Sequence, residues 1–94
     1  MPKVTITRSD RPNKKLKAVF ENGSKKTIHF GQKGASDYTK HKDPERKKRY
    51  IDRHRKNENW DNPKTAGTLS RYVLWNKPTL DASIKDYKKR FNLN

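Results

Sequence analysis

The chain has 94 residues, and its 25 lysine and arginine residues against 10 acidic residues give it a net charge of +15. A folded body with this charge repels itself, so we expect its surface to meet a polyanion, through phosphate groups or clustered carboxylates. The absence of cysteine excludes disulfides and thiolate metal sites and agrees with a reducing compartment. No apolar stretch is long enough to span a membrane, and the N-terminus lacks the apolar core of a signal peptide. We therefore expect a protein that is not secreted.

The composition predicts a folded domain with a small core. Only 28% of the residues are hydrophobic, which is close to the limit below which chains stay disordered. The chain nevertheless contains three phenylalanines, four tyrosines and two tryptophans, more than a disordered basic tail needs. A length of 94 residues suits one domain.

The first third of the chain has the period of β-strands. Residues 4–7, 15–20 and 26–30 alternate with a period of two, with one mainly apolar side and a second side made mostly of Thr, Lys and His, where Val19 is the exception. Between the second and third of these segments, Asn22-Gly23 supplies two residues that tolerate positive φ, as a tight type I′ turn requires. Residues 9–13 are expected to form the loop between the first two strands. The pattern predicts a three-stranded antiparallel meander with one apolar face.

The rest of the chain has helical spacing. Asp43 precedes Pro44 as a capping residue, which predicts a helix from about Pro44 to Asn57. A second helix is expected over 64–75. Thr79 caps a third, in which apolar residues recur at spacings of three and four up to Phe91.

We therefore expect a single α+β domain over residues 1–94, with the meander in 1–30 and three α-helices in 31–94 that pack on its apolar face. The expected core residues are Val4, Ile6, Leu16, Phe20, Ile28, Phe30, Ile51, Leu69, Val73, Ile84 and Tyr87.

Basic residues are densest between Lys40 and Lys56, where nine Lys or Arg residues stand against three acids. Within the helix expected there, basic residues at spacings of three, four and three form one outward stripe. The stripe and its surroundings are the candidate polyanion-binding residues: Lys40, Lys42, Arg46, Lys47, Arg49, Arg53, Lys56, Lys85, Lys88 and Lys89. The alternative is a solvated helix face that serves solubility alone.

Three further residues are candidate contacts to a protein partner, because exposed tryptophan and arginine side chains often anchor interfaces. These residues are Trp60, Arg71 and Trp75. The alternative for each tryptophan is burial in the core.

No catalytic motif is recognisable, and we expect neither a cofactor nor a metal. The best constellation for a small metal-dependent nuclease is His41, Asp43, His54, Glu58 and Asp61. His54 and Glu58 are four apart and would share a helix face, but nothing fixes a third ligand. The glycines at 31 and 34 lack the pattern of a nucleotide-binding loop, and Ser70 has no base near it in sequence.

Several strings along residues 28–91 resemble one small uncharacterised protein family. They are Phe30-Gly31, Asp37-Tyr38-Thr39, His41-Lys42-Asp43, Arg46-Lys47, Tyr50-Ile51, Arg53-His54, Thr65-Ala66-Gly67, Leu69-Ser70-Arg71-Tyr72 and Leu74-Trp75-Asn76-Lys77-Pro78-Thr79. The family occurs in nucleocytoplasmic large DNA viruses, including viruses of algae. The resemblance implies a viral origin and a place in the virion or in the cytoplasm or nucleus of the infected cell, but it names no chemistry.

Three functions remain open. The first is a non-enzymatic structural protein, a minor capsid-associated component of the virion that holds acidic protein surfaces such as those of capsid proteins. The second is sequence-nonspecific binding of the phosphate backbone of DNA or RNA during genome handling or packaging. The third, less favoured, is the small nuclease. Neither of the first two functions involves a small-molecule substrate or a transmembrane segment.

Overall fold

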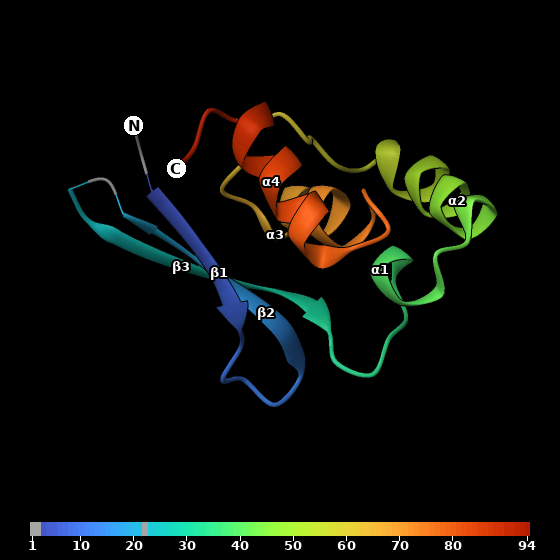
Figure 1. Ribbon diagram of the computed structural model, residues 1–94, viewed down its shortest axis with the longest axis horizontal. Coiled ribbons are helices and arrows are strands. Elements are labelled where there is room, and N and C mark those ends of the chain that lie inside the picture. Colours follow the sequence, from blue (N-terminus) through green and yellow to red (C-terminus); the bar gives the residue numbers. More distant parts are fainter. Residues whose placement is uncertain (1–2, 22) are drawn as a thin grey trace.

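The computed structural model describes residues 3–21 and 23–94, and it has the expected α+β fold (Figure 1). Three strands come first, and helices follow. The elements are β1 (Lys3–Arg8), β2 (Lys14–Glu21), β3 (Lys25–Gln32), α1 (Tyr38–His41), α2 (Pro44–Arg55), α3 (Ala66–Leu69), the π-helix η1 (Ser70–Leu74) and α4 (Leu80–Arg90).

The strands form the predicted antiparallel meander in the order β1-β2-β3. Ala18 in the central strand pairs with Ile6 on one side and Ile28 on the other, so apolar residues line one face. Of the predicted turn, Asn22 lies outside the described residues and Gly23 has φ +82°. Because Glu21 pairs with Lys25, the connection is one residue longer than the predicted two-residue turn.

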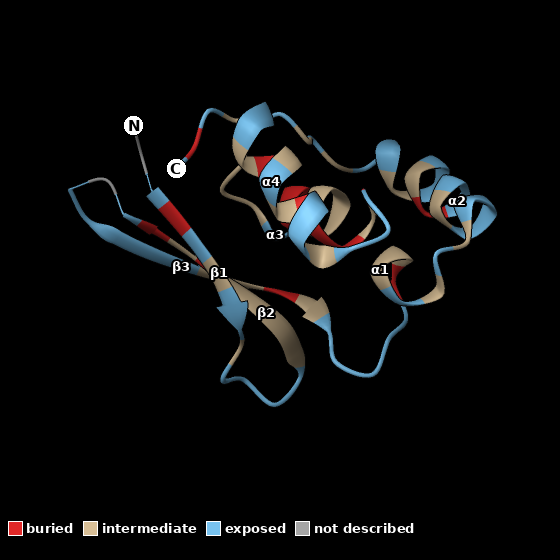
Figure 2. Ribbon diagram, in the orientation of Figure 1, coloured by how far each residue is buried: buried red, intermediate tan, exposed pale blue. Residues whose placement is uncertain are grey.

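The core lies between this apolar face and the helices α3, η1 and α4. Figure 2 shows buried segments on the strands and on these helices, facing one another. Six predicted core residues are buried: Val4, Phe20, Phe30, Leu69, Val73 and Tyr87. Four others are half-buried and pack against them: Ile6, Leu16, Ile28 and Ile84.

The prediction for Ile51 is wrong, since its side chain is half-buried and lies outside the core cluster. Tyr50, its neighbour, is the buried residue of α2 instead. The core also includes Ala18, Leu74 and Leu93. Leu93 is buried because the C-terminal end of the chain runs beside β1, where the Val4 amide donates to the Asn94 carbonyl at 2.9 Å (Figure 1).

The helix α2 does not pack on the sheet as expected. It lies beyond α1 at one end of the molecule (Figure 1), and most of its length is exposed (Figure 2). One of its contacts with the rest of the fold is between Tyr50 and Trp75, whose rings stack with centroids 4.3 Å apart and planes only 3° from parallel. The thin apolar content of this segment already indicated a helix with a narrow buried side.

The helix predicted over Lys64 to Trp75 is shorter and changes type. Thr65 caps it, accepting from the Thr68 amide, and α-helix gives way to π-helix at Ser70. The Trp75 amide donates to the Ser70 carbonyl at 3.0 Å, five residues back. The spacing of apolar residues did not reveal this change, because a single wide turn shifts the register by only one residue.

Candidate polyanion-binding surface

The helix α2 begins at the residue that its sequence predicts, Pro44. Asp43 caps its first turn, and the Asp43 carboxylate accepts from the Glu45 amide at 3.0 Å. On the inner side, the Tyr50 ring lies between two other rings. It stacks on Trp75, and the His54 ring lies on its other side with centroids 4.3 Å apart. This row of three rings fixes the rotation of α2 about its own axis.

Three arginines of α2 form a single cationic surface. Arg46, Arg49 and Arg53 are all exposed, and together with Trp75 they line a shallow hollow of about 200 Å³. No ion pair joins any of the three to an acid within the described part of the chain. We call these three residues the arginine surface. The predicted stripe is therefore correct in its geometry, and Lys56, exposed at the C-terminal cap of α2, continues it without lining the hollow.

Lys47 lies on the opposite side of the same helix, turned inward. Its Nζ donates to the Asn76 carbonyl at 2.7 Å and lies 4.9 Å from the centroid of the Tyr38 ring. Burial lowers the pKa of Lys47, and the positive charges of Arg71 and Lys77 lower it further. Lys47 thus ties α2 to the segment before α4, and we leave it out of the arginine surface.

Arg71 and Trp60 contact each other rather than standing free. The Arg71 guanidinium lies 5.5 Å from the centroid of the Trp60 ring and 4.9 Å from that of Tyr72. It also donates to the Trp75 carbonyl at 2.9 Å, and burial lowers its pKa. The Trp60 indole donates to Glu58 at 3.1 Å. Arg71 and Trp60 therefore serve the packing of the helical part, whereas Trp75 reaches the arginine surface.

The other candidate basic residues lie on different elements. Lys85 and Lys89 are exposed and Lys88 is half-buried on α4, and none of them lines the hollow of the arginine surface. Lys42 is exposed at the end of α1, where its φ is +55°. Lys40 lines a separate hollow at the end of the sheet.

The constellation proposed for a nuclease does not converge. The imidazole of His54 is 3.6 Å from the Glu58 carboxylate, as their spacing predicts. His41, however, accepts from the Asp43 amide through Nδ1 and lies against Trp75, with centroids 5.2 Å apart. Across residues 3–21 and 23–94, no group of three or more His, Asp or Glu side chains is placed to hold a metal ion.

A larger hollow of about 430 Å³ adjoins the arginine surface, and the two share Arg53 and Trp75. Tyr50, His54 and Ser70 also line it. Tyr50 was not among the residues predicted for the site. Its position, four residues after Arg46 and three before Arg53, was the signal that it faces the inner edge of the stripe.

Among the described residues, no helix has both the length and the apolar character needed to cross a membrane.

Comparison with known proteins places the chain in a family. Residues 4–54 match the model of a family of unknown function, DUF5754, and this segment is more than half of the chain. Over 40 residues the chain is 48% identical to "Uncharacterized protein L851" of Acanthamoeba polyphaga mimivirus, and the match covers 40% of each protein. No solved structure matches the chain.

These matches confirm one part of the expected resemblance: the family is uncharacterised, and a similar protein occurs in a giant virus. The family match begins at residue 4, within β1, and ends within α2, so it includes the strands that the resemblance left out. It also includes the whole arginine surface. The chain belongs to DUF5754, a family of unknown function.

Proposed function

We propose that the protein is a non-enzymatic binding protein of viral origin, a minor capsid-associated component of the virus particle that holds an acidic partner on its arginine surface. The observation that carries the proposal is the arrangement of Arg46, Arg49 and Arg53. They are exposed, share one side of α2, border one hollow and pair with no acid of the described chain.

Such an arrangement costs stability unless a negative partner offsets the repulsion between neighbouring charges. Arginine is suited to this task because its planar guanidinium binds a carboxylate or phosphate through two parallel hydrogen bonds. The stacked rings of Tyr50 and Trp75 hold α2 in place beneath the arginines. The surface is therefore ordered before its partner arrives, which lowers the entropic cost of binding.

The similarity to a mimivirus protein supports the viral part of the proposal. A small basic protein in whose described residues the candidate catalytic side chains do not converge fits a role between acidic surfaces inside a particle. Carboxylate clusters on capsid proteins are the partners that the arginine surface would meet there.

Sequence-nonspecific nucleic-acid binding is the second candidate. The net charge of +15 favours it, since phosphate contacts dominate the affinity of such proteins. The two candidates differ in salt dependence. If three arginines each neutralise one phosphate, the slope of log affinity against log salt is about −3.

Charge reversal on the two sides of α2 tests the proposed surface. The variant R49E/R53E should weaken binding to short duplex DNA and to polyglutamate at least about tenfold at about 50 mM salt. The control K48E/R55E makes the same change in net charge on the far side of the same helix and should bind nearly as the unchanged protein does. Fluorescence anisotropy measures both, with circular dichroism to confirm folding. Equal binding by the two folded variants would remove the arginine surface from the proposal.

Mass spectrometry of purified particles of the virus that encodes this chain separates the two candidates. Fractions of shell and genome core are analysed separately. Recovery with the shell supports the acidic protein partner, and recovery with the genome supports nucleic-acid binding. Absence from both fractions would contradict a virion component.

A further inference from the structure

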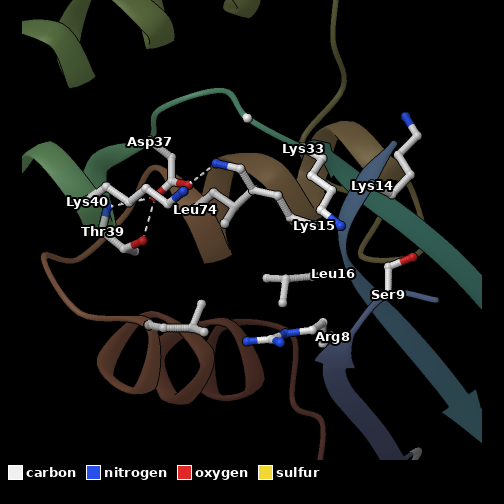
Figure 3. Close-up of a pocket in the computed structure, with 12 residues that line it drawn as sticks. Arg8, Ser9, Lys14, Lys15, Leu16, Lys33, Asp37, Thr39, Lys40 and Leu74 are labelled. Atoms are coloured by element: carbon white, nitrogen blue, oxygen red, sulfur yellow. Dashed lines mark hydrogen bonds and ion pairs between the residues drawn. The ribbon is translucent and has the colours of Figure 1, made fainter. Parts of the chain in front are cut away.

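A second cationic hollow, of about 320 Å³, lies where the ends of β1 and β2 meet the segments around α1 and α4 (Figure 3). It shares no lining residue with the arginine surface. Its volume falls within the range of about 300–1,000 Å³ that is usual for small-molecule sites. It is therefore large enough for a ligand of its own.

Four cationic side chains from four parts of the chain surround this hollow. Arg8 ends β1, Lys14 begins β2, Lys33 follows β3 and Lys40 belongs to α1. In Figure 3, Lys40 and Arg8 lie on separate sides of the opening, and Lys33 and Lys14 lie together on a third side, where the Lys14 ammonium points away from the other residues. None of the four forms an ion pair with an acid in the described ranges. We call these four residues the rim. Segments far apart in sequence thus place like charges around one space, an arrangement that is unfavourable unless an anion fills it.

The hollow contains one carboxylate, and its charge is already matched. Asp37 is only 2% exposed, and the Lys15 ammonium is 2.6 Å from its Oδ2. The Thr39 amide donates to its other oxygen at 3.0 Å, and the Thr39 hydroxyl donates to the same atom (Figure 3). Five cationic side chains against this single acid leave the hollow with a net charge of +4. The carboxylate therefore does not repel an anion held at the rim.

Besides Ser9, Gly34 and Thr39, the remaining wall of the hollow is apolar. Leu16 of β2, Leu74 of η1 and Leu80 of α4 line it. A bare inorganic anion would leave these side chains uncovered, whereas a ligand that combines phosphate with a flat ring covers them. Covering apolar surface contributes roughly 25 cal/mol for each Å² removed from water.

We infer that this hollow binds a phosphate-bearing ligand of nucleotide size, with its phosphates against the rim and its ring system on the three leucines. A free nucleotide and the phosphorylated end of a nucleic-acid strand offer the same chemistry. The site does not depend on the partner proposed for the arginine surface, because the two surfaces have no residue in common.

Isothermal titration calorimetry of the full chain tests the inference with three probes: a nucleoside triphosphate, the parent nucleoside and inorganic triphosphate. The nucleoside triphosphate should bind, the nucleoside should give no measurable heat, and inorganic triphosphate should bind at least about tenfold more weakly because it leaves the leucines exposed. Absence of nucleotide binding would overturn the inference. Equal affinity for inorganic triphosphate would overturn the role of the leucines and reduce the site to an unspecific anion trap.

Substitutions in the rim test whether the nucleotide binds in this hollow. R8Q/K33Q/K40Q removes three exposed rim charges and should weaken nucleotide binding at least about tenfold. The control K3Q/K25Q/K26Q removes three exposed charges elsewhere, and R49E/R53E alters only the arginine surface, so both should bind nucleotide within about twofold of the unchanged protein. If the controls lose as much affinity as the rim variant, net charge alone holds the ligand and the inference fails. A loss confined to R49E/R53E would move the nucleotide to the arginine surface and also overturn it.

A fourth probe shows whether the ligand is a free nucleotide or the end of a nucleic-acid strand. This probe is an oligonucleotide with a 5′-phosphate, and its affinity is compared with that of the same strand without the phosphate. Tighter binding of the phosphorylated strand than of the free nucleotide, sensitive to the rim variant, assigns the site to strand ends. The reverse order assigns it to free nucleotides.

Discussion

Lys15 and Asp37 form the most enclosed ion pair among the described residues. Their side chains are 12% and 3% exposed, and the Lys15 Nζ also donates to the Ala35 carbonyl. Asp37 in turn caps α1 by accepting from the Thr39 amide. The pair therefore joins β2 to the loop that carries the chain from β3 to α1.

Replacing Lys15 tests how much this ion pair contributes to the free energy of unfolding. Lys15→Met leaves the buried Asp37 carboxylate without its counter-charge, and the free energy of unfolding should fall on the order of 3 kcal/mol. Lys17→Met on the same strand is the control. Its partner Asp10 is 3.9 Å away and 79% exposed, so the change should stay within about 0.5 kcal/mol. Urea unfolding measures both, and similar losses in the two variants would contradict the argument.

The composition of the chain does not reveal which cations are free to bind a partner and which serve packing. Arg71 and Lys47 belong to the same basic excess as the arginine surface, and their charge does not distinguish them from Arg49. Their neighbours do. Arg71 lies over the rings of Trp60 and Tyr72, and Lys47 donates to a backbone carbonyl, so packing uses these two cations inside the molecule. A cation serves packing or binding according to what its long side chain meets in the fold.

Among the elements, the end of β3 and the π-helix η1 come close together at Gly31. The φ of this residue is +79°, and a Cβ placed on it would lie 2.8 Å from Cδ1 of Leu74 and 3.3 Å from Cβ of Lys15. Leu74 belongs to the buried core, so it has little freedom to move aside. The sheet and η1 thus pack at a distance that only glycine allows.

Gly31→Ala should therefore destabilise the protein more than Gly34→Ala. Both residues have positive φ, so both changes strain the backbone, but a Cβ at Gly34 meets nothing within 4 Å. The additional loss at Gly31, from overpacking against Leu74, should be about 1–3 kcal/mol. Thermal or urea unfolding of the two variants gives this difference directly. Equal stability of the two variants would show that the Leu74 side chain can move aside without loss of stability, which would contradict the argument.

The strands and the ends of the helices were predictable because local signals set them. Asp43 and Thr79 cap α2 and α4 as their positions indicated, and Asp37 caps α1. The switch to π-helix at Ser70 carried no local signal. The place of α2 beside α1 rather than over the sheet was equally hidden, because it depends on the stacking of Tyr50 on Trp75, residues that are 25 positions apart.

At the scale of the whole molecule, two buried tyrosines link stability to alkaline pH. Burial raises the pKa of Tyr50 from 10.0 to about 12, and the Glu58 carboxylate adds to the rise. Burial also raises the pKa of Tyr87, whose hydroxyl donates to the Pro63 carbonyl at 2.6 Å. The folded protein favours the neutral phenols. The contribution of Tyr50 to stability is fully present below about pH 10, where the unfolded chain begins to ionise, and is lost as pH rises through about 12.

The variant Tyr50→Phe isolates one of these groups while keeping a ring on Trp75. Lysines lose charge over the same range, so the informative quantity is the change in unfolding free energy between about pH 8 and about pH 11, compared for the two proteins. The unchanged protein should lose about 1 kcal/mol more than the variant. Urea unfolding at the two pH values gives the comparison. Identical losses would mean that Tyr50 ionises in the folded state as freely as in the unfolded chain.

Local patterns in the chain predicted the class of the fold, the number of strands and the placement of Arg46, Arg49 and Arg53 on one side of a helix. These properties follow from periodicity, caps and turns, which act over a few residues. Tertiary structure alone decided that Lys47 and Arg71 turn inward and that Arg8, Lys14, Lys33 and Lys40 meet around one hollow. The reason is that contacts between distant segments depend on how the helices settle against the sheet, and no local pattern encodes that arrangement.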